Sequence, residues 1–450
     1  MTSLDSGCYA VSIGAAAALL AGCAQSQPAI GLPGAIPQGV AAARTHTIAH
    51  RILPGSSYQV LFRFGPEAPP HVRSHGAHPA AAVIDVKGTL YGTTYDGGSS
   101  RNGTAYRLSA AGKETVLHTF HGGSDGAHPW AGLTDVNGTL YGTTYDGGSS
   151  DYGTVYSIST TGVEKVLHSF SGGSFDGAYP VAGLIDVNGT LYGTTRGGGG
   201  TEQCSVFSII GCGTVYSISR TGSEKVLHAF TSRPDGADPV AGLLDVKGTL
   251  YGTTRTGGAN QCDTAYGSAP CGTVYSVSTT GVEKVLYSFR GGTSAADGAF
   301  PWAGLLDVDG VLYGTTYNGG NHHCGSFYGG GCGTVYSIST TGSEKVLHEF
   351  GFGPSDGALP RAALVDVKGT LYGTTLEGGS SGPGTVYSVS TTGKEQLVYS
   401  FGKSPDGASP EAGLTDVNGT LYGTTADGGA SKCHTDFGGR GCGIVFKLTP

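Results

Sequence analysis

A five-residue motif that recurs seven times constrains the fold of this chain more than any other feature. All seven copies read Leu-Tyr-Gly-Thr-Thr, and threonine precedes each of them except the fifth, which follows Val311. They begin at Leu90, Leu140, Leu191, Leu250, Leu312, Leu371 and Leu421. Each copy lies within a longer repeated unit, as in Asp125–Phe170. Because a repeat of this size buries an apolar face only against its neighbours, the copies must pack together in one assembly.

Each unit predicts four short strands. In the second unit these span 131–136, 139–144, 153–159 and 164–170. Asn137-Gly138 separates the first two, and such a pair favours a two-residue turn with positive φ at both positions. Thr-Thr-Gly separates the last two, and its glycine suits a left-handed turn position. Antiparallel four-stranded units repeated at this spacing indicate the blades of a β-propeller.

The two ends of the repeat array predict a closed ring. The last unit ends at Pro450, after its third strand, whereas Tyr58–Phe64 precedes the first unit and matches the fourth-strand pattern. An N-terminal strand that completes the last blade removes the exposed sheet edges of an open array. We therefore predict an all-β, seven-bladed propeller of four-stranded antiparallel blades that occupies residues 58–450.

The residues before this domain resemble an export signal. Val11–Ala21 is an apolar run that is too short to span a bilayer, and Leu20-Ala21-Gly22-Cys23 resembles a bacterial lipoprotein box. The resemblance implies a lipoprotein-type signal peptide over 1–22 and lipidation of Cys23, and the Pro/Ala/Gly-rich composition of 23–57 indicates a flexible tether. An ordinary cleaved signal with an incidental cysteine stays open, because Asp5 and the lack of basic residues depart from a positive leader.

The repeated pattern resembles a known family. The units, written AGLxDVxGTLYGTTxxGG…GTVYSIS, are similar to the GloVer tandem repeat of bacterial surface and secreted proteins with a choice of anchor. The resemblance covers all seven units. It implies an extracytoplasmic location in the bacterial cell envelope or outside the cell, and it implies no particular activity.

Eight cysteines outside the leader form four local pairs between second and third strands. The pairs are Cys204/Cys212, Cys262/Cys271, Cys324/Cys332 and Cys433/Cys442. They occur only where this connection is long, so we predict disulfides that fasten each long loop to its base, in an oxidising compartment. A metal site is the alternative: His322 and His323 adjoin Cys324, and His434 adjoins Cys433, but the spacing differs from that of zinc knuckles.

The variable positions predict where a ligand would bind. Connections between second and third strands and the Asp-Gly-Ala-x-Pro segments share one face of a propeller, and insertions gathered on one face are typical of a binding face. Residues within and after those segments open the innermost strands and should surround the channel mouth. Our candidate ligand-binding residues are Trp130, Trp302, Arg361, Glu411, Asp238, His128, Tyr179 and Phe300. An alternative is that the two tryptophans only fill space between blades.

Recurring polar residues are interpreted as scaffold. The Asp-Gly-Ala aspartates should bond to backbone N–H groups in their turns. We assign the fourth-strand histidines His118, His168, His228 and His348 to outer-strand packing or the surface. We predict no metal and no cofactor; a ring of calcium ions is a weaker alternative, because the chain has no D-x-D-x-D-G loop.

Charge and motifs narrow the function. A net charge of −8 without a basic stripe argues against nucleic acid as a partner. No G-x-S-x-G or H-E-x-x-H motif is present, and the first acids to test as catalytic groups are Asp238 and Glu411. The leading prediction is a monomeric surface-anchored or secreted module that binds glycan or protein and meets the membrane only through a lipid anchor. The alternatives are a propeller enzyme of lactonase, lyase or glycosidase type, and a structural envelope protein.

Overall fold

The computed structural model describes residues 52–65, 75–200, 204, 210–264, 267–291, 297–322, 324, 330–351, 353–402, 404–429, 433 and 441–450. The chain divides into two units, Met1–Thr47 and Ile48–Pro450, and every described residue belongs to the second. The signal peptide, Cys23 and most of the expected tether therefore lie outside the described residues. None of the described residues forms a helix with the length and apolarity needed to cross a bilayer.

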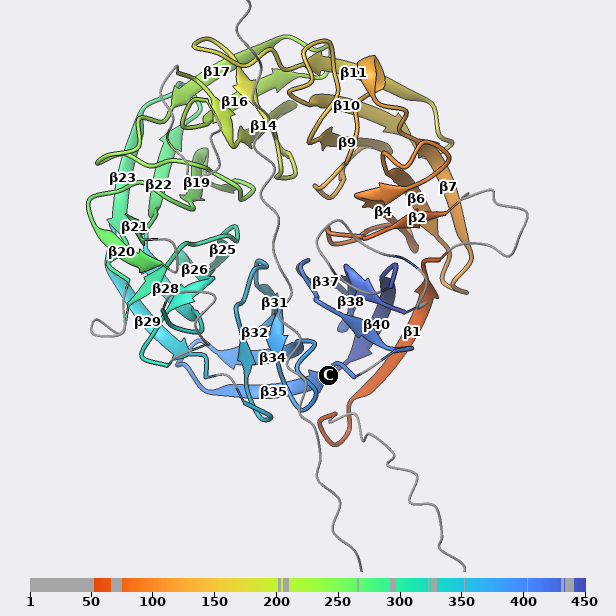
Figure 1. Cartoon of the computed structure of the whole chain (residues 1–450), viewed down its shortest axis with the longest axis vertical. Coiled ribbons are helices and arrows are strands. Elements are labelled where there is room, and N and C mark those ends of the chain that lie inside the picture. Colours follow the sequence, from red (N-terminus) through yellow and green to blue (C-terminus); the bar gives the residue numbers. More distant parts are fainter. Residues whose placement is uncertain are drawn as a thin grey trace, which may run out of the picture. The chain divides into compact units, whose positions relative to one another are not determined.

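The described residues form seven four-stranded antiparallel sheets arranged in a ring (Figure 1). The predicted propeller is therefore confirmed. The innermost strands are β3 (Ile84–Val86), β8 (Thr134–Val136), β13 (Ile185–Val187), β18 (Leu244–Val246), β25 (Leu306–Val308), β31 (Val365–Val367) and β37 (Thr415–Val417). The second strands are β4 (Thr89–Thr94), β9 (Thr139–Thr144), β14 (Thr190–Thr195), β19 (Thr249–Thr254), β26 (Val311–Thr316), β32 (Thr370–Thr375) and β38 (Thr420–Thr425).

The outer half of each blade has the same regularity. The third strands are β6 (Thr104–Leu108), β10 (Thr154–Ser159), β16 (Thr214–Ser219), β22 (Thr273–Ser278), β28 (Thr334–Ser339), β34 (Thr385–Ser390) and β40 (Ile444–Thr449). The fourth strands are β7 (Glu114–Thr119), β11 (Glu164–Ser169), β17 (Glu224–Ala229), β23 (Glu283–Ser288), β29 (Glu344–Glu349), β35 (Glu395–Ser400) and, in the last blade, β1 (Ser57–Arg63). Each outer pair has one register shift, such as the one between Val155 and Tyr156.

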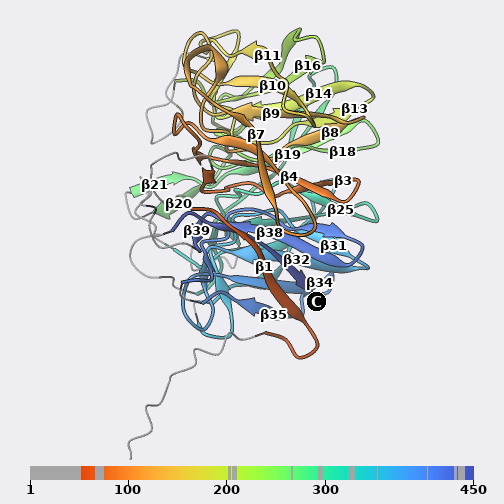
Figure 2. The ribbon, with the colours of Figure 1, turned by 90° about the vertical axis from the view of Figure 1, so that its right-hand side faces the viewer.

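Within the described ranges, short ladders and one 3₁₀ turn, η1 (Gly123–Asp125), supplement the blades on the loop-bearing face. The ladders pair β2 (Gly76–Ala77) with β5 (Asp96–Gly97), β12 (Gly177–Ala178) with β15 (Gly197–Gly198), β24 (Gly298–Ala299) with β27 (Asn318–Gly319), β30 (Gly357–Ala358) with β33 (Glu377–Gly378), β36 (Gly407–Ala408) with β39 (Asp427–Gly428), and β20 (Gln261–Thr264) with β21 (Gly267–Pro270). Figure 2 shows β20 and β21 on one side of the ring and the tips of β3, β13 and β18 toward the other.

The ring closes as the ends of the repeat array predict. Strand β1 pairs with β40, giving the order β1-β40-β38-β37, with Tyr58 opposite Leu448. Tyr58 also stacks on Tyr399 of the neighbouring blade, with ring centroids 3.9 Å apart. The chain before β1 packs on that blade too, because Ile52 forms a bridge with Tyr399.

Hydroxyl groups of the second strands link each blade to the next. In all seven blades the first threonine of Gly-Thr-Thr donates to an alanine carbonyl of the following innermost segment. The last of these bonds joins Thr424 to Ala81 at 2.9 Å and so continues the pattern across the closure. Because each bond engages the alanine carbonyl, the segment after it does not pair within its own blade, and the innermost strands are shorter than predicted. In the second blade, Ala131–Leu133 lines the pocket instead of extending β8.

The motif glycine makes room for the core. A Cβ on Gly142 would lie 2.5 Å from the hydroxyl oxygen of Tyr156, which is fully buried. The cores lie between adjacent blades, as where Phe170 meets Tyr216 of the next blade with centroids 5.2 Å apart. The two-residue turns have the predicted geometry, with φ of 55° at Asn137 and 84° at Gly138. The repeated motif is thus scaffold.

Candidate functional site at the channel mouth

A ring of seven residues in the left-handed region surrounds the channel mouth. They occupy the x position of Asp-Gly-Ala-x-Pro, with φ between 55° and 60°, and are His78, His128, Tyr179, Asp238, Phe300, Leu359 and Ser409. Each N–H donates to a carbonyl of the preceding blade just before its third strand, and each carbonyl accepts from the residue that follows Gly-Thr-Thr. Positive φ is costly for bulky side chains, and the two backbone hydrogen bonds hold each of these residues in this strained conformation.

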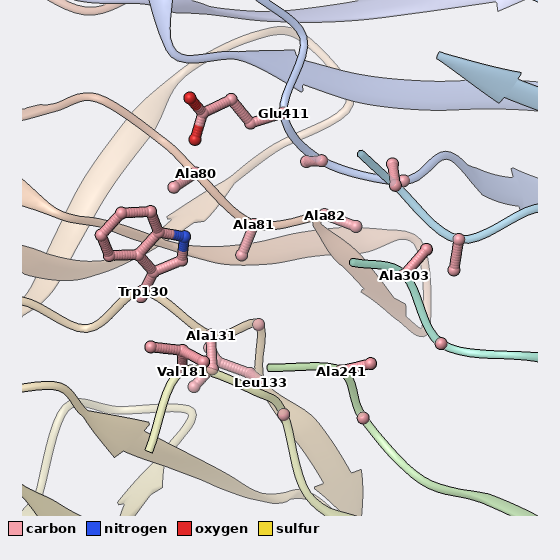
Figure 3. A pocket seen from close by; sticks show the side chains of 18 of the residues that line it. Ala80, Ala81, Ala82, Trp130, Ala131, Leu133, Val181, Ala241, Ala303 and Glu411 are labelled. Atoms are coloured by element: carbon pink, nitrogen blue, oxygen red, sulfur yellow. The ribbon is translucent and has the colours of Figure 1, made fainter. Parts of the chain in front are cut away.

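A pocket of about 380 Å³ opens where the innermost segments begin. The residues after the proline line it, among them Trp130, Val181, Trp302, Arg361 and Glu411. Figure 3 shows Trp130 and Glu411 at this pocket beside the small side chains of Ala80, Ala81 and Ala131. Trp130, Trp302, Arg361 and Glu411 at the mouth are half-buried, and the rest of the pocket lining is mainly alanine and glycine with some leucine, valine, isoleucine and threonine.

Arginine and tryptophan side chains from different blades meet at this mouth. The guanidinium carbon of Arg361 lies 4.2 Å from the ring centroid of Trp302 and 5.8 Å from that of Trp130. Arg255 also lies over Trp302, at 4.6 Å. Arg361 Nη1 donates to Glu411 Oε1 at 2.8 Å. The two tryptophans therefore face arginine side chains, which the expectation of simple space filling does not include.

Asp238 lies between two arginines. Its side chain is 1% exposed; Arg196 Nε donates to its Oδ1 at 2.8 Å, and Arg255 Nη2 pairs with its Oδ2. The pKa of Arg255 is lowered to about 10, chiefly by burial; Asp238 opposes the change, and repulsion from Arg196 and Arg361 adds to it. Burial acts the same way on Arg196, but Asp238 outweighs it and raises that pKa. The acid is held by salt bridges rather than presented to solvent.

A row of aromatic rings extends along the mouth from Trp130. Tyr95 stacks on His128 at 4.7 Å and meets Trp130 at 5.0 Å, while Tyr145 lies 6.2 Å from Trp130 and 5.2 Å from Tyr179. His128 Nδ1 lies 2.9 Å from an oxygen of Asp146. Rings that contact one another in this way form a rigid, largely apolar surface with polar edges.

A smaller pocket of about 200 Å³ adjoins the first and is lined by His78, Tyr95, Trp130, Arg361, Glu411 and Asp427, with two alanines. His78 Nδ1 lies 2.7 Å from Asp96 and its Nε2 lies 3.2 Å from the Gly441 carbonyl. Burial lowers the pKa of His78, but the bonds to acceptors on both sides outweigh it and raise that pKa. Burial raises the pKa of Asp427, and Ser409 and His78 oppose this.

The structure brings together most of the predicted candidates. Trp130, Trp302, Arg361 and Glu411 line one pocket, and Asp238 joins them through Arg255. His128 and Tyr179 lie in the aromatic row. Phe300 packs instead against the core cluster that contains Cys271 and Ala299.

Sequence reasoning placed the x-position residues, His78 among them, at the channel mouth, but it missed the pocket residue Asp427 and the pairing of Arg196 and Arg255 with Asp238. Arg196 and Arg255 follow Gly-Thr-Thr directly and Asp427 lies one residue further, so comparison of the repeats at these two positions was the available signal.

The four cysteine pairs are disulfides. The bonds join Cys204 to Cys212, Cys262 to Cys271, Cys324 to Cys332 and Cys433 to Cys442. The alternative of a metal held by these sulfurs is therefore wrong; His323 and His434 lie outside the described residues. The later cysteine of each pair also supplies the carbonyl that accepts from the ring residue of the next blade, as Cys212 does for Asp238 at 2.9 Å. Each disulfide thus anchors the backbone beneath the mouth.

Histidine, aspartate and glutamate meet at the outer blade junctions. The sets are His118, Asp125 and Glu164; His168, Asp176 and Glu224; His228, Asp235 and Glu283; and His348, Asp356 and Glu395. Ligand atoms within each set lie within 4.8 Å of one another, and this donor set suits a divalent cation.

Hydrogen bonds also account for these sets. Asp176 accepts from Ser171 N–H and Gly177 N–H, as predicted for the turn aspartates, and from His168. At an equivalent junction Tyr287 replaces histidine, and its hydroxyl donates to Asp297. The fourth-strand histidines pack on phenylalanine as expected, and in addition they hold the turn aspartates.

Comparison with solved structures agrees with the fold. The chain is similar to virginiamycin B lyase from Staphylococcus aureus, with 14% identity, a TM-score of 0.51, and coverage of 88% of this chain and 99% of that one. A streptogramin B lyase is 12% identical, with a TM-score of 0.49 and coverage of 87% of this chain and 97% of that one. A gluconolactonase from Xanthomonas campestris is 10% identical, with a TM-score of 0.38 and coverage of 88% of this chain and 91% of that one. At such identities the likeness shows the propeller fold alone.

Comparison with sequences identifies the repeat. A search of curated proteins finds no match. The family model described as Gloeobacter/Verrucomicrobia repeat matches residues 42–207 and 208–437, which confirms the resemblance inferred from the repeated motif. Because the two matches span most of the chain, the protein belongs to the Gloeobacter/Verrucomicrobia repeat family.

Proposed function

We propose that the propeller is an extracytoplasmic binding module that recognises a glycan or a protein side chain at the channel mouth. The observation that carries the proposal is the pocket in which Trp130 and Trp302 flank Arg361. Aromatic faces with a few fixed polar groups are typical of sites for small polar ligands, and a volume of about 380 Å³ falls within their usual range.

The ionisable groups at the mouth form salt bridges and hydrogen bonds with one another, and this supports a role in binding rather than in proton transfer. Asp238 and Glu411, the acids first considered for catalysis, are both held by arginines. Both ring nitrogens of His78 face acceptors, so this imidazole is suited to carrying charge rather than to accepting a proton.

One observation favours an enzyme as the second candidate. Asp427, whose pKa burial raises, lines the smaller pocket together with Glu411, and two carboxyl groups in unequal environments are the usual basis of acid–base catalysis on sugars. The lyase likeness fits this candidate only at the level of the fold. Loss of a measured glycan-cleaving activity in Asp427→Asn, with binding retained, would favour the enzyme.

Tryptophan substitution tests the binding module. We expect Trp130→Ala and Trp302→Ala each to weaken binding by about tenfold or more on a panel of glycans and purified envelope components, because each removes a ring worth about 1.5 kcal/mol or more. Val163→Ala is the matched control, since Val163 is 72% exposed in the turn between β10 and β11. Unchanged binding in both tryptophan variants would contradict the proposal and leave the structural envelope role.

The location forms part of the proposal. Four disulfides support an oxidising, extracytoplasmic compartment, and Cys23 would carry the lipid that anchors the module. Cys23→Ala should move the protein from the membrane fraction to the soluble fraction after export. Retention of this variant in the membrane fraction would contradict a lipid at Cys23.

A further inference from the structure

The aromatic row continues beyond the pocket. Tyr145 follows Trp130, Tyr179 follows Tyr145, and Tyr152 meets Tyr179 edge-on with ring centroids 5.4 Å apart. Trp130 lines both pockets at the mouth, whereas the three tyrosines line neither of them. All four rings are only half-buried. The row therefore presents ring surface that a ligand confined to the pocket would not contact.

The row lies over the second and third blades, on one side of the mouth. Tyr145 follows β9, Tyr152 precedes β10 and Tyr179 precedes β13. On the other side Trp302 contacts Tyr317, with ring centroids 6.0 Å apart. The positions equivalent to Tyr179 and Tyr145 in the next two blades have aliphatic or small side chains, namely Leu359, Leu376, Ser409 and Ala426. The extended ring surface therefore leads away from the pocket in one direction.

The loop that carries two of these tyrosines is short. In the second blade the connection between second and third strands spans 145–153, so Tyr145 and Tyr152 lie near its two ends. The same connection spans 196–213 in the third blade, where the disulfide of Cys204 and Cys212 fastens it. The second blade therefore has half-exposed aromatic rings where the third blade has a long loop, and such differences between equivalent loops are typical of a binding face.

The charged groups at the mouth are paired with one another. The pairs are Arg196 and Arg255 with Asp238, Arg361 with Glu411, His78 with Asp96, and His128 with Asp146. Because each of these groups already has a partner in the protein, a charged ligand would have to break one of these pairs in order to form a new one. An uncharged ligand keeps every pair.

We infer that the ligand is an uncharged oligosaccharide whose first sugar packs on Trp130 in the pocket and whose following sugars lie along Tyr145, Tyr179 and Tyr152. The inference rests on the proposed binding function and specifies its ligand class. A pyranose presents a C–H face with hydroxyl groups around its edge, and a phenol or indole ring presents a matching apolar face with a polar edge. The rings contact one another and are rigid, so binding has few side chains to order. A protein side chain would use the pocket alone.

Saccharides of increasing length separate this inference from the proposed function. Calorimetric titration of the full chain would use cello-, manno- and N-acetylchito-oligosaccharides, each from the disaccharide to the hexasaccharide. In at least one series the affinity should rise about threefold to tenfold with each added sugar until the row is covered, and then become constant, because each sugar buries further ring surface.

The alternative outcomes differ for the two proposals. A hexasaccharide that binds no more tightly than its disaccharide in every series would overturn the inference and leave the binding function standing. Binding of a protein component or an acidic saccharide alone would do the same. No binding by any saccharide or protein component of the panel would overturn both.

Other blades supply substitutions that this fold accommodates in the row. Ser409 occupies the position of Tyr179 in the seventh blade, and Asn102 occupies that of Tyr152 in the first. The carbonyl of Asn102 accepts from His128 N–H at 2.8 Å, just as that of Tyr152 accepts from Tyr179 N–H at 2.8 Å. Tyr179→Ser and Tyr152→Asn should therefore fold. Each should weaken hexasaccharide binding by about threefold to tenfold, the usual value of an aromatic contact, and leave disaccharide binding unchanged.

Leu376→Ala is the matched control. Leu376 follows Gly-Thr-Thr in the sixth blade, away from the row, and Ala426 occupies that position in the seventh. This variant should bind both saccharides as the parent protein does. If Tyr179→Ser and Tyr152→Asn keep the parent melting temperature and either bind the hexasaccharide normally or lose affinity for both saccharides by the same factor, the inference is wrong.

Discussion

At the scale of single residues, the most unusual groups outside the mouth are the glutamates that begin the fourth strands. The pKa of each is raised to about 7, mainly by burial and in addition by a nearby aspartate. These glutamates are Glu164, Glu224, Glu283, Glu344 and Glu395. The Oε1 atom of each is buried and has no hydrogen-bond partner among the described residues. Their negative charge is therefore unfavourable in the folded protein.

This placement predicts a stability that falls as pH rises. Each glutamate binds its proton more tightly in the folded state than in the unfolded state, so its contribution is present below about pH 4.5 and is lost as pH rises through about 7. We expect a lower melting temperature at pH 8 than at pH 5.5. Glu164→Gln with Glu224→Gln should reduce this difference and raise the melting temperature at pH 8.

The seventh blade junction supplies the control. There Glu114 Oε2 lies 2.7 Å from His75 Nδ1, and His75 takes the place of the usual aspartate. Glu114→Gln should therefore lower the melting temperature at pH 5.5 instead of raising it at pH 8. A melting temperature that is the same at both pH values in the parent protein would contradict the assignment.

At the scale of strands and loops, local signals in the sequence determine the blade, but contacts between blades determine the site. The Asn137-Gly138 turn was predictable because its chemistry is complete within two residues. The contact of Arg196 with Asp238 spans 42 residues, so it depends on how one blade is placed against the next. The bond between His168 and Asp176 was missed for a related reason, since a register shift in the outer strand pair sets which side chains face the turn.

The disulfide-bonded loops allow a test at this scale. Cys262 and Cys271 join the two ends of the β20–β21 hairpin, and the Cys271 carbonyl accepts from Phe300 N–H at 2.8 Å. Replacing both cysteines with serine should lower the free energy of unfolding by about 2–3 kcal/mol, because a short closed loop constrains the unfolded chain. Urea denaturation measures the change. Ser268→Ala in the same hairpin is the control, and an unchanged urea midpoint in the double variant would show that the loop is held without its disulfide.

At the scale of the whole molecule, closure depends on one strand from the start of the domain. Tyr58 of β1 lies opposite Leu448 of β40, as Glu164 lies opposite Ile158 in the second blade. Without β1 the last blade would present the free edge of β40 to solvent, and such an edge pairs readily with other chains. Because the fourth strand of the last blade precedes the first repeat in the sequence, the two ends of the domain lie side by side in one sheet.

Circular permutation tests whether the ring, rather than the order of the chain, holds the fold. A Thr-Gly link from Pro450 to Ser57 would give β40 and β1 a connection like Thr160–Val163 between β10 and β11. New ends placed between β16 and β17 would make β17 the closing strand. Because every strand pair and every Thr-to-Ala bond is kept, we expect a monomer with a melting temperature within a few degrees of the parent domain. Deletion of 52–63 without permutation is the contrasting variant, and it should aggregate through β40. A permutant that fails to fold while the deletion variant stays monomeric would show that β1 does not stabilise the ring.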